Sequence, residues 1–179
     1  GNSLNFDGVD DFVSVPHNAN QLLTNGFTIS AWIKPDTVGE IDGRIVDKSA
    51  GASAENGFKY VVLTNMANAQ INSGTTRPSA TNSVIFANGN WYHVVVTAAA
   101  GAPNATITQY VNGVQSGTPG ISGTLSGITT TNVLCIGNRA GTTSCNTDRT
   151  FDGSIDEVII FNRALTAGEV QALYEMDLS

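Results

Sequence analysis

The stretch FDGSIDEVIIFNRALTAGEVQALY, at residues 151–174, decides the fold of this chain, and SLNFDGVDDFVSV, at residues 3–15, carries a matching phrase. Both contain Phe-Asp-Gly beside apolar residues that alternate with polar ones. Such alternation is typical of a half-buried strand, and the glycine marks a turn at its end. Two matched strand signals at opposite ends of the chain indicate one closed β domain.

Further strands are predicted between these ends. β-branched and aromatic residues alternate with polar ones, and Gly, Asn and Ser separate the segments. Asn112-Gly113 predicts a type I′ hairpin turn, because both central residues of that turn have a positive φ. The spacing of the segments predicts an antiparallel β-sandwich. The predicted strands are residues 27–34, 57–63, 68–72, 83–87, 92–100, 105–111, 132–137 and 154–162.

One helix is predicted, near the C-terminus. Thr166 and Glu169 have the spacing of a capping box, in which the hydroxyl accepts from the N–H of Glu169 and the carboxylate accepts from the N–H of Thr166. Val170, Leu173 and Tyr174 then fall on one face of the helix. We therefore expect a short amphipathic helix that packs on the sandwich.

The composition indicates one domain and excludes two classes of partner. No charge run or proline-rich linker divides the 179 residues, so a single domain over residues 1–179 is expected. The formal net charge of −7 disfavours nucleic acid and anionic membranes as partners. No apolar run approaches the roughly 20 residues that span a bilayer, so no membrane insertion is expected. Only 13% of the residues are charged, so the surface must be covered mostly by Asn, Ser, Thr and Gly, whose polar groups also suit sugar hydroxyls.

The two cysteines, Cys135 and Cys145, are predicted to form a loop-closing disulfide. Two cysteines alone cannot make a zinc site, and their spacing differs from that of a Cys-x-x-Cys redox pair. A disulfide would place the protein in an oxidising compartment. The alternative is a pair of free thiols, with Cys135 packed in a strand.

Six phrases follow one another along the chain: LNFDGVDDFVSV, FTISAWIKP, NWYHVVVT, YVNGVQ, CIGNR and FDGSIDEVIIFNRALTAGEVQALY. In this order they resemble the laminin-G-like branch of the concanavalin A-like lectin and glucanase superfamily, which is related in fold to pentraxins. The resemblance implies a jelly roll of two antiparallel sheets with paired terminal strands, whose loops commonly hold calcium and sometimes a glycan. Residues 41–86 match least well, and ligand-specific loops are expected there.

Carboxylates near the two ends are candidate calcium ligands. Ca²⁺ takes about 6 to 8 oxygens, and Asp-Gly turns offer carboxylate and carbonyl oxygens together. The candidates are Asp7, Asp10, Asp11, Asp152 and Asp156. If the terminal strands pair as the resemblance implies, Asp7 and Asp156 approach one another, and Asp10 is the expected third ligand. Neighbouring carboxylates repel each other unless a cation lies between them. The alternative is that each Asp before a Gly caps its own turn.

The sequence does not predict an enzyme. The glucanases of the superfamily carry Glu-x-Asp-x-x-Glu on one strand, and the chain lacks this motif. Asp156 and Glu157 are adjacent on a strand, so their side chains point to opposite faces and cannot act together on one glycosidic bond. A serine or cysteine nucleophile needs a base, usually histidine. We expect His93 to be a hydrogen-bonded structural residue, and His17 has no evident partner.

Aromatic and loop residues supply the candidate glycan site. Sugar rings stack on exposed Trp or Tyr, but Trp32 and Trp91 occupy positions that the resemblance assigns to the core. The predicted glycan-binding residues are therefore Tyr60, Tyr110, Asn138, Arg139, Asn146 and Arg149.

The leading hypothesis is a non-catalytic, lectin-like carbohydrate-binding module of a secreted, multidomain protein of bacterial type, with bound calcium and a polysaccharide or glycan as partner. The second hypothesis is an extracellular adhesion or structural domain that recognises a protein, for example on a surface filament. A polysaccharide hydrolase or lyase is the third.

Overall fold

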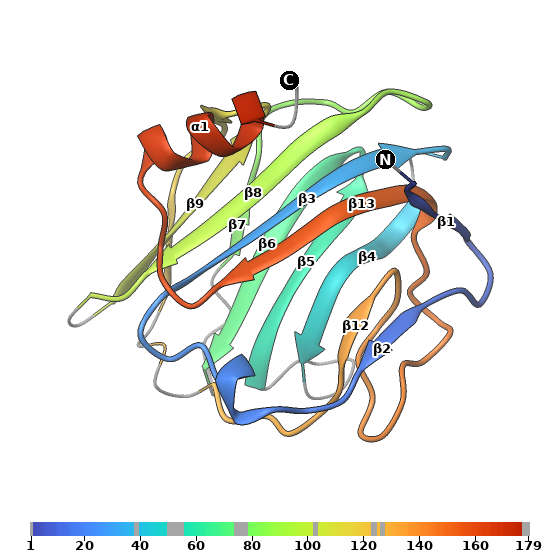
Figure 1. The fold of residues 1–179 in the computed structure, drawn as a ribbon, viewed down its shortest axis with the longest axis horizontal. Helices are drawn as coiled ribbons and strands as arrows, with labels where there is room; N and C mark the ends of the chain where they lie inside the picture. Colours follow the sequence, from blue (N-terminus) through green and yellow to red (C-terminus); the bar gives the residue numbers. More distant parts are fainter. Residues whose placement is uncertain are drawn as a thin grey trace.

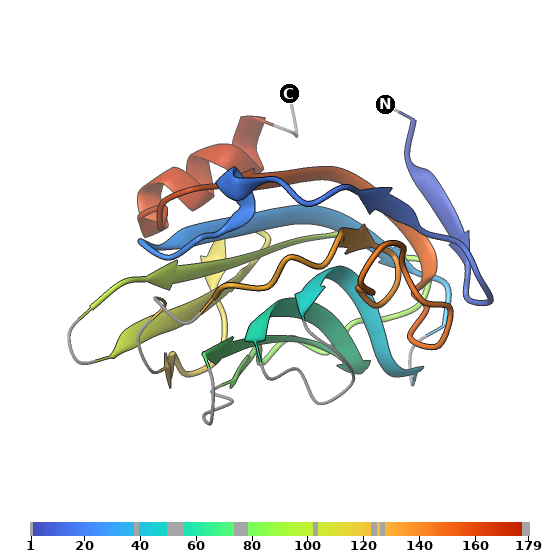
Figure 2. The ribbon, with the colours of Figure 1, turned by 90° about the horizontal axis from the view of Figure 1, so that it is seen from below.

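The computed structural model describes residues 2–37, 40–49, 56–73, 79–101, 104–122, 125 and 128–176. Two antiparallel sheets lie face to face and form a sandwich, with one helix on the outer face of one sheet (Figures 1 and 2). This arrangement confirms the predicted jelly-roll fold and the predicted C-terminal helix.

Sheet A has the strand order β1-β13-β3-β8-β9-β10, with β11 also paired to β9. Its strands are β1 (Leu4–Asp7), β3 (Phe27–Pro35), β8 (Tyr92–Ala99), β9 (Ala105–Val111), β10 (Val114–Gln115), β11 (Gly120–Ser122) and β13 (Asp152–Phe161). Sheet B has the order β2-β12-β4-β5-β6-β7. Its strands are β2 (Val13–Val15), β4 (Glu40–Ser49), β5 (Asn56–Thr64), β6 (Met66–Ser73), β7 (Ser79–Thr81) and β12 (Leu134–Ile136).

The terminal strands pair, as the resemblance implies. In β1, Leu4 lies opposite Ile155 and Asp7 lies opposite Asp152. β13 is hydrogen-bonded to β3 on its other side, and a bulge between Asp156 and Ile159 shifts that register. β13 therefore brings the two ends of the chain together near one edge of sheet A.

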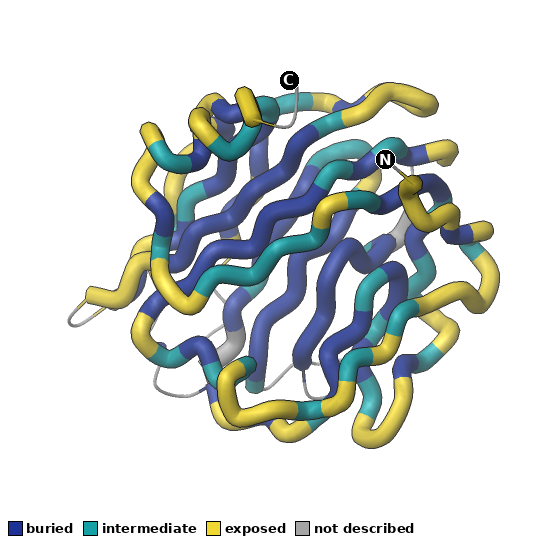
Figure 3. The backbone as a smooth tube through the Cα atoms, in the orientation of Figure 1, coloured by how far each residue is buried: buried dark blue, intermediate teal, exposed yellow. Residues whose placement is uncertain are grey.

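The core lies between the sheets, and the long strands of both sheets contribute most of it. The middle strands are buried along most of their length (Figure 3). In β5, Phe58, Tyr60 and Val62 belong to this core, whereas Lys59 lies on the opposite face. Because side chains alternate along a strand, Lys59 marks the outer face of sheet B.

The predicted strand at residues 83–87 is wrong. This segment has no strand partner, and the N–H of Phe86 donates instead to the carbonyl of Asn65 at 2.8 Å. Phe86 is buried while Ile85 is 67% exposed. The apolar alternation here reflects residues that pack on the core as the chain crosses from sheet B to sheet A.

The helix α1 (Ala167–Met176) starts with the predicted capping box. The N–H of Thr166 donates to the Glu169 carboxylate at 2.8 Å, and the N–H of Glu169 donates to the Thr166 hydroxyl at 3.3 Å. Val170 is buried against Val95 and Tyr110 of sheet A. Among the residues described, no helix is long and apolar enough to cross a membrane.

Replacing Glu169 with Gln is expected to lower the melting temperature at pH 7. Two hydrogen bonds from Arg163, at 3.0 and 2.7 Å, and those from Thr166 lower the pKa of Glu169 to about 2 from its ordinary 4.5. Since the folded-state pKa is the lower one, the carboxylate stabilises the fold above pH 4.5, and this contribution is lost as the pH falls towards 2. The difference in melting temperature from wild type should therefore shrink over that pH range. The matched control is Glu175→Gln, at the other end of α1, and a pH-independent difference for Glu169→Gln would contradict the argument.

Candidate functional site

The turn after β1 gathers acidic side chains. Asp7, Asp10 and Asp11 are exposed, and one carboxylate oxygen from each lies within 4.8 Å of the others. Gly8 shapes this turn with a φ of +73°, and its carbonyl accepts a hydrogen bond from the Thr150 hydroxyl at 2.6 Å. The turn therefore brings carboxylates together and is fixed to the loop before β13.

Some of these oxygens already accept hydrogen bonds from the backbone. Asp7 Oδ1 accepts from the N–H of Val9 at 2.8 Å, and Asp11 Oδ2 accepts from the N–H of Asp7 at 3.1 Å. Asp7 thus caps its own turn, which was the alternative reading of Asp-Gly. The remaining oxygens of Asp7 and Asp11, and both oxygens of Asp10, accept no hydrogen bond from the described part of the chain.

The expected place of Asp156 in this group needs correction. The register sets Asp7 opposite Asp152, while Asp156 lies opposite Trp32. Four residues along a strand correspond to about 13 Å, so Asp156 is remote from Asp7. The resemblance implied the pairing of the terminal strands but could not give its register, and Asp11 takes the place predicted for Asp156.

The predicted disulfide between Cys135 and Cys145 is present. It holds the loop between β12 and β13, and both sulfur-bearing residues pack with Val133 and Ala140 in a small apolar cluster. The β12–β13 loop is thereby closed on itself beside β4.

Two of the predicted glycan-binding residues hold this loop together instead. Asn138 is fully buried, and its Oδ1 accepts from the backbone N–H of Arg139 at 2.9 Å and of Arg149 at 3.3 Å. Asn146 donates from Nδ2 to the carbonyl of Ala140 at 3.0 Å. The prediction that Asn138 contacts a glycan is wrong, because no water-facing atoms are left on it, and the amide of Asn146 is engaged within the loop.

Both loop arginines are paired with carboxylates. Arg139 lies 3.0 Å from Asp148, with 16% of its side chain exposed, and Arg149 lies 3.8 Å from Asp42, with 37% exposed. Of the two arginines, Arg149 therefore keeps the more accessible side chain.

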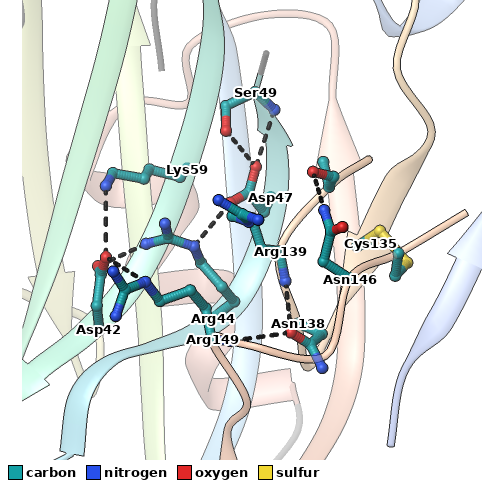
Figure 4. Close-up of polar contacts among 12 residues, drawn as sticks. Asp42, Arg44, Asp47, Ser49, Lys59, Cys135, Asn138, Arg139, Asn146 and Arg149 are labelled. Carbon is teal, nitrogen blue, oxygen red and sulfur yellow. Dashed lines mark hydrogen bonds and ion pairs between the residues drawn. A yellow bond between two sulfur atoms is a disulfide. The ribbon is translucent and has the colours of Figure 1, made fainter. Parts of the chain in front are cut away.

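A network of charged side chains connects this loop to the outer face of sheet B (Figure 4). Asp42 contacts Arg44, with Lys59 at 3.7 Å. Arg44 Nε lies 2.7 Å from Asp47 Oδ2, and the side chains of both residues are at most 1% exposed. Ser49 donates to the other oxygen of Asp47 from its N–H at 2.8 Å and its hydroxyl at 2.6 Å. Burial raises the pKa of the Asp47 carboxyl, against the opposing effects of Arg44 and of the hydrogen bonds from Ser49.

The predicted glycan-binding tyrosines are both buried. Tyr60 is 0% exposed in the main core, where burial also raises the pKa of its hydroxyl. Tyr110 is 6% exposed and lies beneath α1. Neither ring is accessible for stacking on a sugar, so both predictions are wrong.

The two tryptophans differ in how far they are buried. Trp32 is partly buried, and its ring stacks on that of Tyr174 with 5.7 Å between the centroids. The ring of His93 is tilted against Trp32 at 5.2 Å. The expected structural role of His93 is confirmed by its buried contact with the Ser30 hydroxyl at 2.8 Å.

Trp91 is not a core residue, since 39% of it is exposed, and Lys34 Nζ lies 5.7 Å from its ring centroid. Trp91 directly precedes β8, where no alternation reveals which way a side chain points.

A cavity of about 1100 Å³ opens between the sheets, between the part of β13 that β1 does not cover and β2, the edge strand of sheet B. Its apolar lining includes Phe58, Leu134, Ile136, Val158 and Ile160. Its polar lining is Asn18, Asn20, Gln21, Thr24, Asn25 and Asn162. Within the described part of the chain no Asp, Glu, Lys, Arg or His lines it. Sequence reasoning missed this cavity, because it arises from where the two sheets end and not from a local motif.

Similar proteins were found by sequence profile and by structure. Residues 7–171 match the profile of the concanavalin A-like lectin/glucanases superfamily, in its laminin G group. No curated protein matches the sequence. A heptameric SAP-like pentraxin from Limulus polyphemus superposes with a TM-score of 0.68 at 17% identity, covering 96% of this chain and 81% of the pentraxin.

Bacterial toxin domains share the fold as well. The binding domain of Paraclostridial Mosquitocidal Protein 1 has a TM-score of 0.71 at 16% identity, over 99% of this chain and 44% of that domain. A botulinum neurotoxin type C structure, from a study of cell entry through two ganglioside molecules, has a TM-score of 0.67 at 17% identity over 92% and 39%. The chain thus spans less than half of each toxin structure. With a profile match over most of its length, it belongs to the concanavalin A-like lectin/glucanases superfamily, in the laminin G group.

Proposed function

We propose that this domain is a non-catalytic carbohydrate-binding module of a secreted protein and that it holds calcium at the turn after β1. The observation that carries the proposal is the meeting of Asp7, Asp10 and Asp11 within 4.8 Å. None of the three forms an ion pair with a described residue. Close carboxylates without a positive partner favour binding of a cation.

The donor set suits calcium. Hard carboxylate oxygens, together with backbone carbonyls and water, are the ligands that Ca²⁺ prefers. Asp7, Asp10 and Asp11 would hold the ion, and Asp7 would also keep the turn in shape through its hydrogen bond from Val9. When bound, the ion supplies a positive charge and open coordination positions that suit sugar hydroxyls.

The placement of the acidic residues supports a binding role over hydrolysis. A glycosidase needs two carboxyl groups on either side of a bond held in a cleft. The large cavity has no carboxylate among its described lining residues, and the carboxylate of Asp47 is sealed against Arg44. Similar structures described as binding domains agree with this role.

The disulfide supports secretion, because disulfides persist mainly in oxidising compartments. The net charge of −7 supports a neutral or cationic partner over nucleic acid.

A glycan array probed with and without calcium tests the proposal. We expect hits that weaken on chelation, together with a rise in melting temperature when Ca²⁺ is added, since a ligand of the native state alone stabilises it by RT ln(1 + [L]/Kd). Asp10→Asn should weaken calcium binding by about tenfold, or 1.4 kcal/mol, through loss of a charged ligand. Asp156→Asn is the matched control and should bind calcium like wild type.

The outcomes separate the two parts of the proposal. The calcium site would be contradicted if Ca²⁺ gave no heat of binding, or if wild type and Asp10→Asn had equal affinities for Ca²⁺. The carbohydrate-binding role would be contradicted if the glycan array gave no hits although calcium was bound. The second candidate, an extracellular adhesion or protein-interaction domain, is favoured by the edge of β13, which β1 covers only from Asp152 to Ile155.

A further inference from the structure

β13 is only partly covered along one edge. β1 pairs with its first residues, from Asp152 to Ile155. Beyond the bulge, residues 159–161 pair with β3 alone. Among the described residues no other strand, backbone group or side chain forms a hydrogen bond with residues 158–161. Alternate N–H and C=O groups in this part of β13 therefore lack a partner on the side away from β3.

This unpaired edge faces a groove. The cavity of about 1100 Å³ and a second one of about 290 Å³ are both lined by Ile136 and Val158, so they adjoin along β13. Figure 1 shows β1 beside one end of β13 only, so that the rest of β13 lies at the border of sheet A, while β2 is the edge strand of sheet B beside β12. We define the edge groove as these two cavities together.

The wall of the edge groove is aliphatic. Val15 and Ile136 of sheet B, and Val158 and Ile160 of sheet A, pack against the main core but are only partly buried. Apolar side chains are thus accessible from both sheets, whereas Trp, the usual stacking surface for sugars, does not occur among the described lining residues.

The charges of the edge groove lie at one end. The larger cavity has no ionisable side chain among its described lining residues. The smaller one, towards β1, is lined by Asp156 and Glu157, and Glu157 is exposed. An occupant that matches these charges is uncharged along most of its length and basic at the end beside Glu157.

We propose that the edge groove binds an extended peptide as an added strand on β13. The peptide would hydrogen-bond to the free edge of residues 158–161 and place alternate apolar side chains against Val158 and Ile160, in the manner of β-strand addition. Strand pairing within sheet A is antiparallel, including that of β1 on this same edge. The peptide is therefore antiparallel to β13, which sets its C-terminal end, and its basic residue, beside Glu157.

Amide-capped peptides of alternating Thr and Val test the proposal. Acetyl-Thr-Val-Thr-Val-Thr-Val-Lys-amide should bind more tightly than the version with Lys at the N-terminal end. Two further versions of the first peptide are N-methylated: one on the backbone nitrogen of every valine, the other on that of every threonine. Since only one alternate set of N–H groups faces β13, one version should bind about tenfold more weakly and the other should keep most of its affinity. Amide exchange at residues 158–161 should slow only when a peptide binds.

Variants of the protein give an independent check. Glu157→Lys should reverse the preference, so that a peptide ending in Glu binds better than one ending in Lys. It keeps a straight-chain residue at a position with a φ of 48°. Val158→Thr should weaken binding, whereas Val114→Thr, at a position 69% exposed on β10, should not.

Several results would overturn the proposal. One is the absence of binding by any of these peptides at millimolar concentration. A second is that the two N-methylated versions bind equally well. A third is that a neutral oligosaccharide, without peptide, slows amide exchange at residues 158–161. A fourth is that dimer formation slows amide exchange at these residues. The last two would assign the edge groove to a glycan or to a second copy of the chain.

Discussion

Replacing Arg44 with methionine should lower the free energy of unfolding by about 3 to 5 kcal/mol, the range found when one partner of a buried ion pair is removed. Arg44 lies between Asp42 and Asp47 and is 1% exposed. Without it the Asp47 carboxylate would keep its hydrogen bonds from Ser49 but lose its contacting cation in an environment closed to water. Asp42 would still have Lys59 and Arg149 nearby. The destabilisation therefore comes mainly from the unpaired charge of Asp47.

Urea unfolding as a function of pH checks this prediction. Burial already holds the pKa of Asp47 above 3.8, and removing Arg44 removes an interaction that lowers it. A carboxyl group whose pKa is higher in the folded state than in the unfolded state lowers the free energy of unfolding as the pH rises above the unfolded-state pKa. The deficit of Arg44→Met should therefore be largest near pH 7 and shrink as the pH falls and Asp47 takes up a proton.

Two further variants complete this test. Arg44→Met combined with Asp47→Leu should recover most of the stability, because a buried pair can often be replaced by apolar residues without loss. Arg163→Met breaks an exposed ion pair and should change stability much less. A deficit for Arg44→Met that matches that of Arg163→Met, or that does not depend on pH, would show that water reaches Asp47.

Replacing both Cys135 and Cys145 with alanine should lower the free energy of unfolding by about 3 kcal/mol. The disulfide closes a loop with a sequence separation of 10, and in the chain-entropy model a loop of this size accounts for that stabilisation. Cys135 also lies in β12, which pairs with both β2 and β4. Loosening β12 should therefore release the outer strand of sheet B.

Urea unfolding of wild type with and without a reducing agent provides the comparison. The reduced wild type and the double alanine variant should show similar midpoints, both below that of the oxidised protein. Equal midpoints in all three would show that the β12–β13 loop is fixed by its hydrogen bonds and ion pairs alone.

Features with a local signal could be predicted from the sequence. The capping box at Thr166 predicted α1. Asn112-Gly113 predicted a turn in which both residues have a positive φ, and their φ values are 51° and 78°. Tyr60 was placed wrongly although a signal was present. In GFKYVVL, Lys59 indicates the outer face, and Tyr60 must then point inward with Phe58.

Features that depend on distant partners were not predictable. No strand was predicted at β4, because Arg44 and Asp47 lie in its middle and neutralise each other only in the folded state. Whether Asp156 joins Asp7 depended on the register of β1 and β13, which the sequence does not fix. The edge groove depends on where β1 stops along β13, a property of the assembled sheets.

The pairing of β1 with β13 governs the order in which the fold can form. Leu4 lies opposite Ile155, and β3 lacks one of its two neighbouring strands until β13 has been synthesised. Such long-range contacts require a large loop to close before they become favourable, which makes folding slow. During synthesis the first strands keep open edges until β13 is available, so this domain is expected to be most prone to aggregation just before β13 is added.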